Sequence, residues 1–195
     1  MYIICSDLEG IYTPEIWINV SIKTGIEKLK LTTRDISDYD VLMKGRLALL
    51  REHKLTLSDI QNVIATLEPL PGAGDFLAWL RSEYQLIIVS DTFREFAGPL
   101  MARLDYPTLL CHNLTTDENG MMTEYNLRQK DAKKMVVQAL QDLNYSVIAI
   151  GDSYNDLTMI RKADTGILLR PPQNVIDENR DLPVVTTYKD LKKKI

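Results

Sequence analysis

The sequence has few cysteines, no long apolar run and no excess of positive charge, and each absence excludes a class of protein. Only two cysteines, Cys5 and Cys111, occur in 195 residues, so neither a disulfide framework nor a cysteine metal site is predicted. No stretch approaches the roughly 18 apolar residues of a membrane span, and the first residues lack the pattern of a secretory signal. We therefore expect a cytoplasmic protein without a membrane partner, and Cys5 as a buried, unreactive strand residue.

Glycine and proline are also scarce, at 9 and 8 residues, while hydrophobic residues make up 45% of the chain. These proportions exclude a disordered or collagen-like chain. Lysine and arginine total 23 against 27 aspartates and glutamates, and the resulting net charge of −4 makes nucleic acid an unexpected partner. The length exceeds the roughly 100–150 residues of a common domain without reaching two domains, so we expect one core carrying an insertion.

Hydrophobic periodicity divides the chain into a helical block and an alternating region. Residues 14–69 carry apolar side chains at three- and four-residue spacing, which predicts several amphipathic helices, one of them capped by Thr56. After residues 69–74, predicted strands alternate with helices, a pattern typical of a doubly wound, Rossmann-like parallel sheet. We therefore predict an α/β core over residues 1–13 and 70–195, with a small helical cap at 14–69 inserted after the first strand.

The expected core elements follow from runs of apolar residues between turn signals. The expected strands are residues 2–5, 85–90, 108–111, 146–150, 165–169 and 184–185, and the expected helices are 75–83, 93–104, 131–143 and 154–162. A hairpin or flap is predicted at 112–127, around Asn119 and Gly120. Because ligands of such sheets bind outside the carboxyl ends of the strands, we expect the chemistry there.

Polar side chains follow several of the predicted strands. They are Asp7 and Glu9 after the first strand, Ser90 and Asp91 after the second, and Asp152 to Asp156 after the 146–150 strand, with Lys130 opening the helix before it. A single aspartate after a strand is usually a turn former or helix cap. Their joint placement at one edge of a parallel sheet favours a shared cleft.

Carboxylates that share a cleft repel one another and need a cation. Oxygen ligands suit Mg²⁺, which typically binds one or two carboxylates together with substrate phosphate. A metal would keep Asp7 ionised, so that it could attack phosphorus and form an aspartyl phosphate. Ser90 and Lys130 would then donate to the phosphoryl oxygens and neutralise their charge.

Four segments resemble, in order and approximate spacing, the motifs of the haloacid dehalogenase superfamily of phosphohydrolases. They are Asp7-Leu-Glu9-Gly, Ser90-Asp-Thr, Lys130 and Gly151-Asp152-Ser-Tyr-Asn155-Asp156. The helical block resembles that superfamily's first-position cap, as found in phosphoserine phosphatases. Residues 14–17, 33–35, 38–43 and 127–131 extend the resemblance to phosphoserine phosphatases that also transfer phosphate from phosphoserine to homoserine.

The resemblance implies a role for each matched residue of the core. Asp7 would be the nucleophile and a Mg²⁺ ligand, Glu9 the general acid and base and a ligand through its backbone carbonyl, and Asp152 the third ligand. Ser90 and Lys130 would bind the phosphoryl group, and Asp156 would support the metal and Lys130. Asp91 and Asn155 would belong to the substrate site.

In the cap, the resemblance matches Glu15 to the acid that receives the substrate ammonium and Arg46 to the arginine that binds its carboxylate. A planar, bidentate guanidinium suits that task. Tyr39 and Met43 would line the pocket. From spacing alone, Arg46 could equally be a solvated helix residue, Glu15 a first-turn residue favoured by the helix dipole, and Tyr39 and Met43 packing residues. His53 and His112 are interpreted as structural or surface residues.

Glu9 departs from the family pattern, which has aspartate two residues after the nucleophile in most phosphatases. Glutamate is longer by one methylene, roughly 1.5 Å, and a displacement of about 1 Å in an active site can cost on the order of 100-fold in rate. We hypothesise that the longer side chain makes room for an acceptor larger than water, such as the hydroxyl of homoserine.

The implied function is a Mg²⁺-dependent phosphoserine phosphatase and phosphoserine:homoserine phosphotransferase that acts through an aspartyl phosphate. It would serve serine and threonine biosynthesis. Its partners would be O-phospho-L-serine, with L-homoserine or water as acceptor, and a homodimer is compatible with the resemblance. The alternative is a phosphatase for another small phosphomonoester, and a receiver-type signalling module is disfavoured because receivers lack such a helical block.

Overall fold

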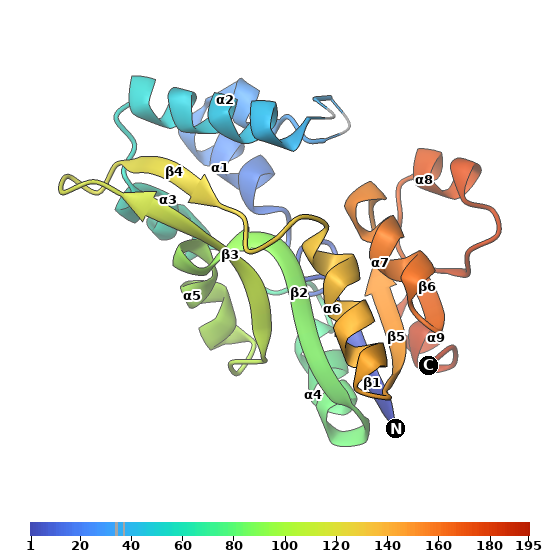
Figure 1. Ribbon diagram of the computed structural model, residues 1–195. Coiled ribbons are helices and arrows are strands. Elements are labelled where there is room, and N and C mark those ends of the chain that lie inside the picture. Colours follow the sequence, from blue (N-terminus) through green and yellow to red (C-terminus); the bar gives the residue numbers. More distant parts are fainter. Residues whose placement is uncertain (34, 37) are drawn as a thin grey trace.

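The computed structural model describes residues 1–33, 35–36 and 38–195. Arg34, which belongs to one of the resembling stretches, lies outside these ranges. Within them, seven strands form one sheet in the order β4-β3-β2-β1-β5-β6-β7 (Figure 1). Their bounds are β1 (Tyr2–Ser6), β2 (Gln85–Phe93), β3 (Leu109–Thr116), β4 (Met122–Asn126), β5 (Ser146–Gly151), β6 (Thr165–Leu169) and β7 (Val184–Val185). Neighbouring strands run parallel, except that β3 and β4 are antiparallel.

Strand β1 is the centre of the sheet and pairs with β2 on one side and β5 on the other. Its residues alternate between two apolar layers, because successive side chains of a strand point to opposite faces. Ile4 contributes to one layer, and Ile3 and Cys5 contribute to the other. Cys5 is fully buried, and burial raises the pKa of its thiol to about 12. The prediction of a buried strand cysteine is confirmed, and a thiol with a raised pKa forms little of the reactive thiolate.

Helices cover both faces of the sheet. The layer that contains Ile4 packs against α4 (Ala73–Glu83), α5 (Arg94–Arg103) and α9 (Tyr188–Lys192). The opposite layer packs against α6 (Ala132–Asp142), α7 (Leu157–Lys162) and α8 (Gln173–Glu178). The doubly wound α/β architecture predicted from the sequence is confirmed, although α8 was not predicted.

A block of helices lies between β1 and α4, as predicted. It consists of α1 (Ile16–Thr24), the short 3₁₀ helix η1 (Glu27–Lys30), α2 (Tyr39–Glu52) and α3 (Leu57–Ile64). The Thr56 hydroxyl accepts a hydrogen bond from the amide of Asp59, whose carboxylate accepts one from the amide of Thr56, so the expected cap of α3 is present. The block leaves and rejoins the core at one place, because the Leu70 amide donates to the Tyr12 carbonyl over 2.8 Å.

The predicted hairpin is formed by β3 and β4, which extend from the edge of the sheet alongside the helical block (Figure 1). Tyr125 of β4 and Tyr39 of α2 meet edge to face, with ring centroids 5.9 Å apart. The Leu57 amide donates to the Gly120 carbonyl at the hairpin turn over 2.9 Å. The hairpin therefore connects the core to two helices of the block. Among the described residues, none of the helices combines the length and apolarity required to cross a bilayer.

Candidate active site

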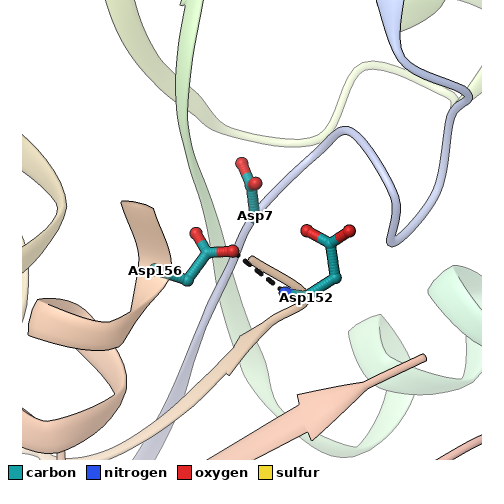
Figure 2. A group of neighbouring side chains, drawn as sticks. All are labelled: Asp7, Asp152 and Asp156. Atoms are coloured by element: carbon teal, nitrogen blue, oxygen red, sulfur yellow. Dashed lines mark hydrogen bonds between the residues drawn. The ribbon is translucent and has the colours of Figure 1, made fainter. Parts of the chain in front are cut away.

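Three acidic side chains from two strand ends converge at the carboxyl edge of the sheet. Figure 2 shows Asp7, which follows β1, facing Asp152 and Asp156, which follow β5. All three residues are buried, and each has a carboxylate oxygen within 4.8 Å of the others. Burial and the charge of Asp156 raise the pKa of Asp7, and the same causes raise the pKa of Asp152 to about 7.

This cluster fits a divalent cation because its negative charge is only partly compensated by protein groups. Asp156 accepts from the amides of Asp152 and Ser153 through one oxygen, at 2.9 and 3.1 Å, and from the ammonium of Lys133 through the other, at 2.8 Å. Asp156 is thus held by protein donors. The raised pKa values of Asp7 and Asp152 show that these two carboxylates would gain most from a cation. Oxygen donors of this kind suit Mg²⁺.

The lysine of the cluster is Lys133, which corrects the prediction of Lys130. The Lys133 ammonium lies 3.1 Å from Asp7, 2.8 Å from Asp156 and 3.5 Å from Asp91. Asp131 adopts a left-handed conformation (φ 51°) and helix α6 begins at Ala132, so Lys133 lies in the first turn and faces inward. Lys130 precedes the helix and is exposed. Although burial opposes its charge, the carboxylates of Asp156 and Asp7 raise the pKa of Lys133.

Ser90 and Asp91 lie where the pairing of β2 with β3 becomes irregular, between Val89 and Phe93. Ser90 is buried, and its hydroxyl oxygen accepts from the Thr92 amide over 3.2 Å. This bond leaves the hydroxyl proton of Ser90 available for a ligand. Asp91 accepts a hydrogen bond from the side-chain amide of Asn155 over 2.9 Å. Asn155 therefore lies at the site, where the resemblance placed it.

His112 is a site residue that the interpretation as structural or surface did not identify. It is buried, and its Nε2 atom lies 3.4 Å from a carboxylate oxygen of Asp91. His112 is part of β3 and directly follows the predicted strand at 108–111. The rule that polar residues at strand ends gather at one edge of the sheet applies to it as well as to Asp7 and Asp152.

Glu9 connects the core to the first helix of the block. One of its carboxylate oxygens accepts from the amide of Ile16, the first residue of α1, over 2.7 Å. Burial and the nearby charge of Glu15 raise the pKa of Glu9 to about 8, while the bond from Ile16 acts in the opposite direction. Glu9 is therefore protonated for a substantial part of the time at neutral pH, as a proton donor requires.

Arg46 is buried and is not a solvated helix residue. Its guanidinium carbon lies 4.5 Å from the centroid of the Trp17 ring, and one terminal nitrogen donates to the Leu31 carbonyl over 2.7 Å. Burial lowers the pKa of Arg46 to about 10, so the group stays charged at neutral pH. Its Nε atom is buried without a hydrogen-bond partner among the described residues. A guanidinium held in this way is ready for an anionic ligand.

The other cap predictions have mixed outcomes. Glu15 lines the cavity, as the resemblance implies, and it is the N-cap residue of α1 and not a first-turn residue. Tyr39 lines the cavity as predicted, and its hydroxyl donates to the Asp91 carbonyl over 3.3 Å. Met43 is fully buried in the apolar core, and its sulfur lies 3.6 Å from Arg46. Met43 is not among the described residues that line the cavity, so it supports Arg46 from behind.

These groups surround one cavity of about 120 Å³ between the sheet edge and the helical block. A second cavity of about 670 Å³ adjoins it and shares Tyr39, Asp91 and Lys133. The described residues that line the first cavity include Asp7, Glu9, Ser90, Lys133 and Asn155 from the core, and Glu15, Trp17, Tyr39 and Arg46 from the block. The cavity thus combines groups suited to phosphoryl chemistry with charged groups of both signs.

Comparisons with known proteins agree with this arrangement. Residues 13–164 match the model of the haloacid dehalogenase-like hydrolases. The chain is 58% identical to "Phosphoserine phosphatase" of Pseudomonas syringae over 98% of this chain and 81% of the relative. It is also 58% identical to "Phosphoserine phosphatase ThrH" of Pseudomonas aeruginosa, over 99% and 94% of the two chains.

A similar fold is found in the crystal structure of a phosphoserine phosphatase in its apo form. The two chains superpose with a TM-score of 0.80 at 18% identity, over 99% of this chain and 98% of the other. The family match and the two relatives confirm the resemblance inferred from the motifs at Asp7, Ser90 and Asp152. The chain belongs to the haloacid dehalogenase-like hydrolases.

Proposed function

We propose that this protein is a Mg²⁺-dependent phosphoserine phosphatase that also transfers the phosphoryl group of phosphoserine to homoserine. The observation that carries the proposal is the presence of Arg46 and Glu15 in the same small cavity as Asp7 and Lys133. A phosphoserine molecule has a phosphate, a carboxylate and an ammonium group. The cavity offers donors for the first, a guanidinium for the second and a carboxylate for the third.

In the first half of the reaction, Asp7 attacks phosphorus and the bond to the serine oxygen breaks, leaving the phosphoryl group on the Asp7 carboxylate. Lys133 and the hydroxyl of Ser90 donate to the phosphoryl oxygens, whose charge is spread in a loose transition state. A Mg²⁺ ion held by Asp7, Asp152 and the backbone carbonyl of Glu9 would supply positive charge that keeps Asp7 ionised and the phosphate neutralised.

Glu9 donates a proton in the first half of the reaction and accepts one in the second. Its pKa of about 8 makes it a donor to the departing serine oxygen near neutral pH, which releases serine with a neutral hydroxyl. The resulting carboxylate then takes a proton from the attacking acceptor, and the phosphoryl group leaves Asp7 for that acceptor. The bond from the Ile16 amide holds one carboxylate oxygen throughout, so the other is available for the proton.

The identity of the acceptor decides between hydrolysis and transfer. Water yields inorganic phosphate, whereas the hydroxyl of homoserine yields phosphohomoserine. The name of the Pseudomonas aeruginosa relative supports the phosphatase activity, and the glutamate at position 9 motivates the transfer. If the longer side chain admits the larger acceptor, Glu9→Asp will lower the ratio of transfer to hydrolysis, and an unchanged ratio would remove this explanation.

The decisive experiment incubates the protein with Mg²⁺ and phosphoserine, with and without homoserine, and separates free phosphate from phosphohomoserine. We expect phosphate release without homoserine and phosphohomoserine when homoserine is added. Turnover of other small phosphomonoesters but not of phosphoserine would instead support the alternative, a phosphatase of this family with a different substrate.

A further inference from the structure

We propose that His112 and Asp91 form a positioning pair that holds Lys133 in place for phosphoryl transfer. The proposal rests on the proposed phosphoryl chemistry at Asp7 and adds two residues to it. Neither His112 nor Asp91 is required to contact phosphorus. Each acts through the lysine, whose ammonium must stay at one place while charge moves from Asp7 to the phosphoryl oxygens.

The environment of His112 fixes which ring nitrogen carries the proton. The amide of Arg128 donates to Nδ1 over 3.1 Å, and a backbone amide can only donate. Nδ1 is therefore the acceptor, and a neutral imidazole carries its proton on Nε2. That atom lies 3.4 Å from a carboxylate oxygen of Asp91. His112 is 2% exposed, which limits competition from water at Nε2.

Asp91 is held from three directions. One carboxylate oxygen faces Nε2 of His112, and the other accepts from Asn155 over 2.9 Å and lies 3.5 Å from the Lys133 ammonium. Despite burial, Lys133 and His112 keep the pKa of Asp91 below its usual value. The Asp91 carboxylate is thus fixed in orientation and negative, as an anchor for an ammonium group must be.

Among the described residues, Lys133 makes three ionic contacts, and those to Asp156 and Asp91 keep their charge while Asp7 is phosphorylated. Asp7 becomes phosphorylated, so its attraction for the ammonium changes during turnover. Asp156 also accepts hydrogen bonds from the amides of Asp152 and Ser153, and it lies close to the candidate cation site. Asp91 is the contact that lies outside the acidic cluster, on the neighbouring strand. Without His112, the Asp91 carboxylate could rotate toward solvent and release the ammonium.

The test uses two variants, each of which keeps one of the two hydrogen-bonding groups of the imidazole. The side-chain oxygen of His112→Asn can accept from the Arg128 amide, but its nitrogen does not reach Asp91. The amide nitrogen of His112→Gln can take the place of Nε2 and donate to Asp91. We expect His112→Asn to lower kcat about 10- to 100-fold with little change in KM, as misplacement of a catalytic group does, and His112→Gln to restore most of kcat.

A second readout separates positioning from a general structural effect. Vanadate imitates the five-coordinate arrangement at phosphorus, whereas inorganic phosphate imitates the ground state. In His112→Asn we expect the inhibition constant for vanadate to rise in parallel with the loss of kcat, while that for phosphate stays within about twofold of wild type. Thermal melting controls for folding. Equal behaviour of the two variants, or equal changes in both inhibition constants, would overturn the proposal.

The assay is run with an aryl phosphate as well as with phosphoserine, because the pair acts on the phosphoryl group alone. A wild-type protein that cleaves the aryl phosphate but not phosphoserine would refute the proposed substrate while the His112 comparison still decides the positioning role. If neither variant folds, Asp91→Asn takes their place with the same expected pattern. Unchanged kcat and vanadate inhibition in Asp91→Asn would then overturn the proposal.

Discussion

Asp7 is the residue on which the proposed chemistry depends. The Leu8 amide donates to one of its carboxylate oxygens over 2.8 Å, and Lys133 lies 3.1 Å from the same oxygen. We expect Asp7→Asn to reduce release of phosphate from phosphoserine to background, because an amide is a poor nucleophile at phosphorus. Asp75→Asn, the same change at an exposed position of α4, serves as the control. Turnover that persists in Asp7→Asn would exclude an aspartyl phosphate.

Arg46 is expected to decide which phosphate esters are accepted. Lysine keeps the charge but loses the second, parallel hydrogen bond of the guanidinium, and a hydrogen bond to a charged group contributes roughly 1.5–3 kcal/mol. Arg46→Lys should therefore raise KM for phosphoserine about 10- to 100-fold. An aryl phosphate, which has no carboxylate to bind, should be affected less than about threefold. The exposed Arg51 at the end of α2 provides the matched control, Arg51→Lys. Equal losses on the two substrates would show that Arg46 does not select for the carboxylate.

At the scale of single residues, the sequence predicted the chemistry of the site better than its geometry. Lysines occur at 130, 133 and 134, and all three offer the same ammonium. Helix α6 begins at Ala132, within one residue of the expected start. Which lysine faces the carboxylates depends on the direction of the first turn, and the left-handed Asp131 leaves Lys130 outside the helix and Lys133 inside it. Met43 lies in the apolar core, which is the packing role that its spacing alone allowed, whereas the resemblance implied a place in the pocket.

At the scale of elements, apolar periodicity predicted the buried strands and longer helices, and it failed where polar residues continue a strand. Strand β3 was expected at 108–111 but runs over Leu109–Thr116. Its second half pairs with β4 at the edge of the sheet, and Leu114 is the one buried apolar residue among the otherwise exposed residues 113–116, which is too few for an apolar run. The six residues of α8 include one buried side chain, Val175, too few to show a helical period.

The close contact between β6 and α7 predicts that alanine will change the stability of the protein in opposite directions at two glycine positions. A Cβ at Gly166 would lie 2.4 Å from the Ile160 carbonyl oxygen, a backbone atom that cannot turn aside. We expect Gly166→Ala to lower the free energy of unfolding by about 1–3 kcal/mol, as overpacking does. A Cβ at Gly45, which is exposed within α2, would meet nothing within 4 Å.

Gly45→Ala is therefore the control for that experiment, and we expect it to raise stability by about 0.5–1 kcal/mol because alanine favours helix. Urea denaturation measures both variants. A Gly166→Ala protein as stable as wild type would show that β6 and α7 can separate at no cost.

At the scale of the whole molecule, the acidic site makes stability depend on pH and metal. Burial raises the pKa of Glu9 to about 8 and that of Asp152 to about 7, both well above their values in an unfolded chain. Between these values the folded protein binds protons that the unfolded chain has released. Their contribution to the free energy of unfolding is complete below about pH 4 and is lost as pH rises to about 8. The contribution is on the order of a few kcal/mol.

Thermal melting in chelator at several pH values checks this expectation. The melting temperature of Glu9→Gln, which has no charge to bury, should exceed that of wild type by an amount that grows between pH 5.5 and 8. Mg²⁺ should stabilise wild type more at pH 8 than at pH 5.5, because protons compete for the same carboxylates. A difference between wild type and Glu9→Gln that does not vary with pH would contradict the assignment of the raised pKa to Glu9.

The hydrogen bond between Leu70 and Tyr12 also has a consequence for how proteins of this fold can change their substrates in evolution. The helical block begins and ends at neighbouring positions of the core. A block of a different length can therefore be inserted there, because the entropy lost on closing a loop grows only slowly with loop length. The acidic cluster and Lys133 lie on segments outside the block, whereas Glu15 and Arg46 lie within it. Exchanging the block would therefore give the same phosphoryl chemistry a new range of substrates, without a new sheet having to evolve.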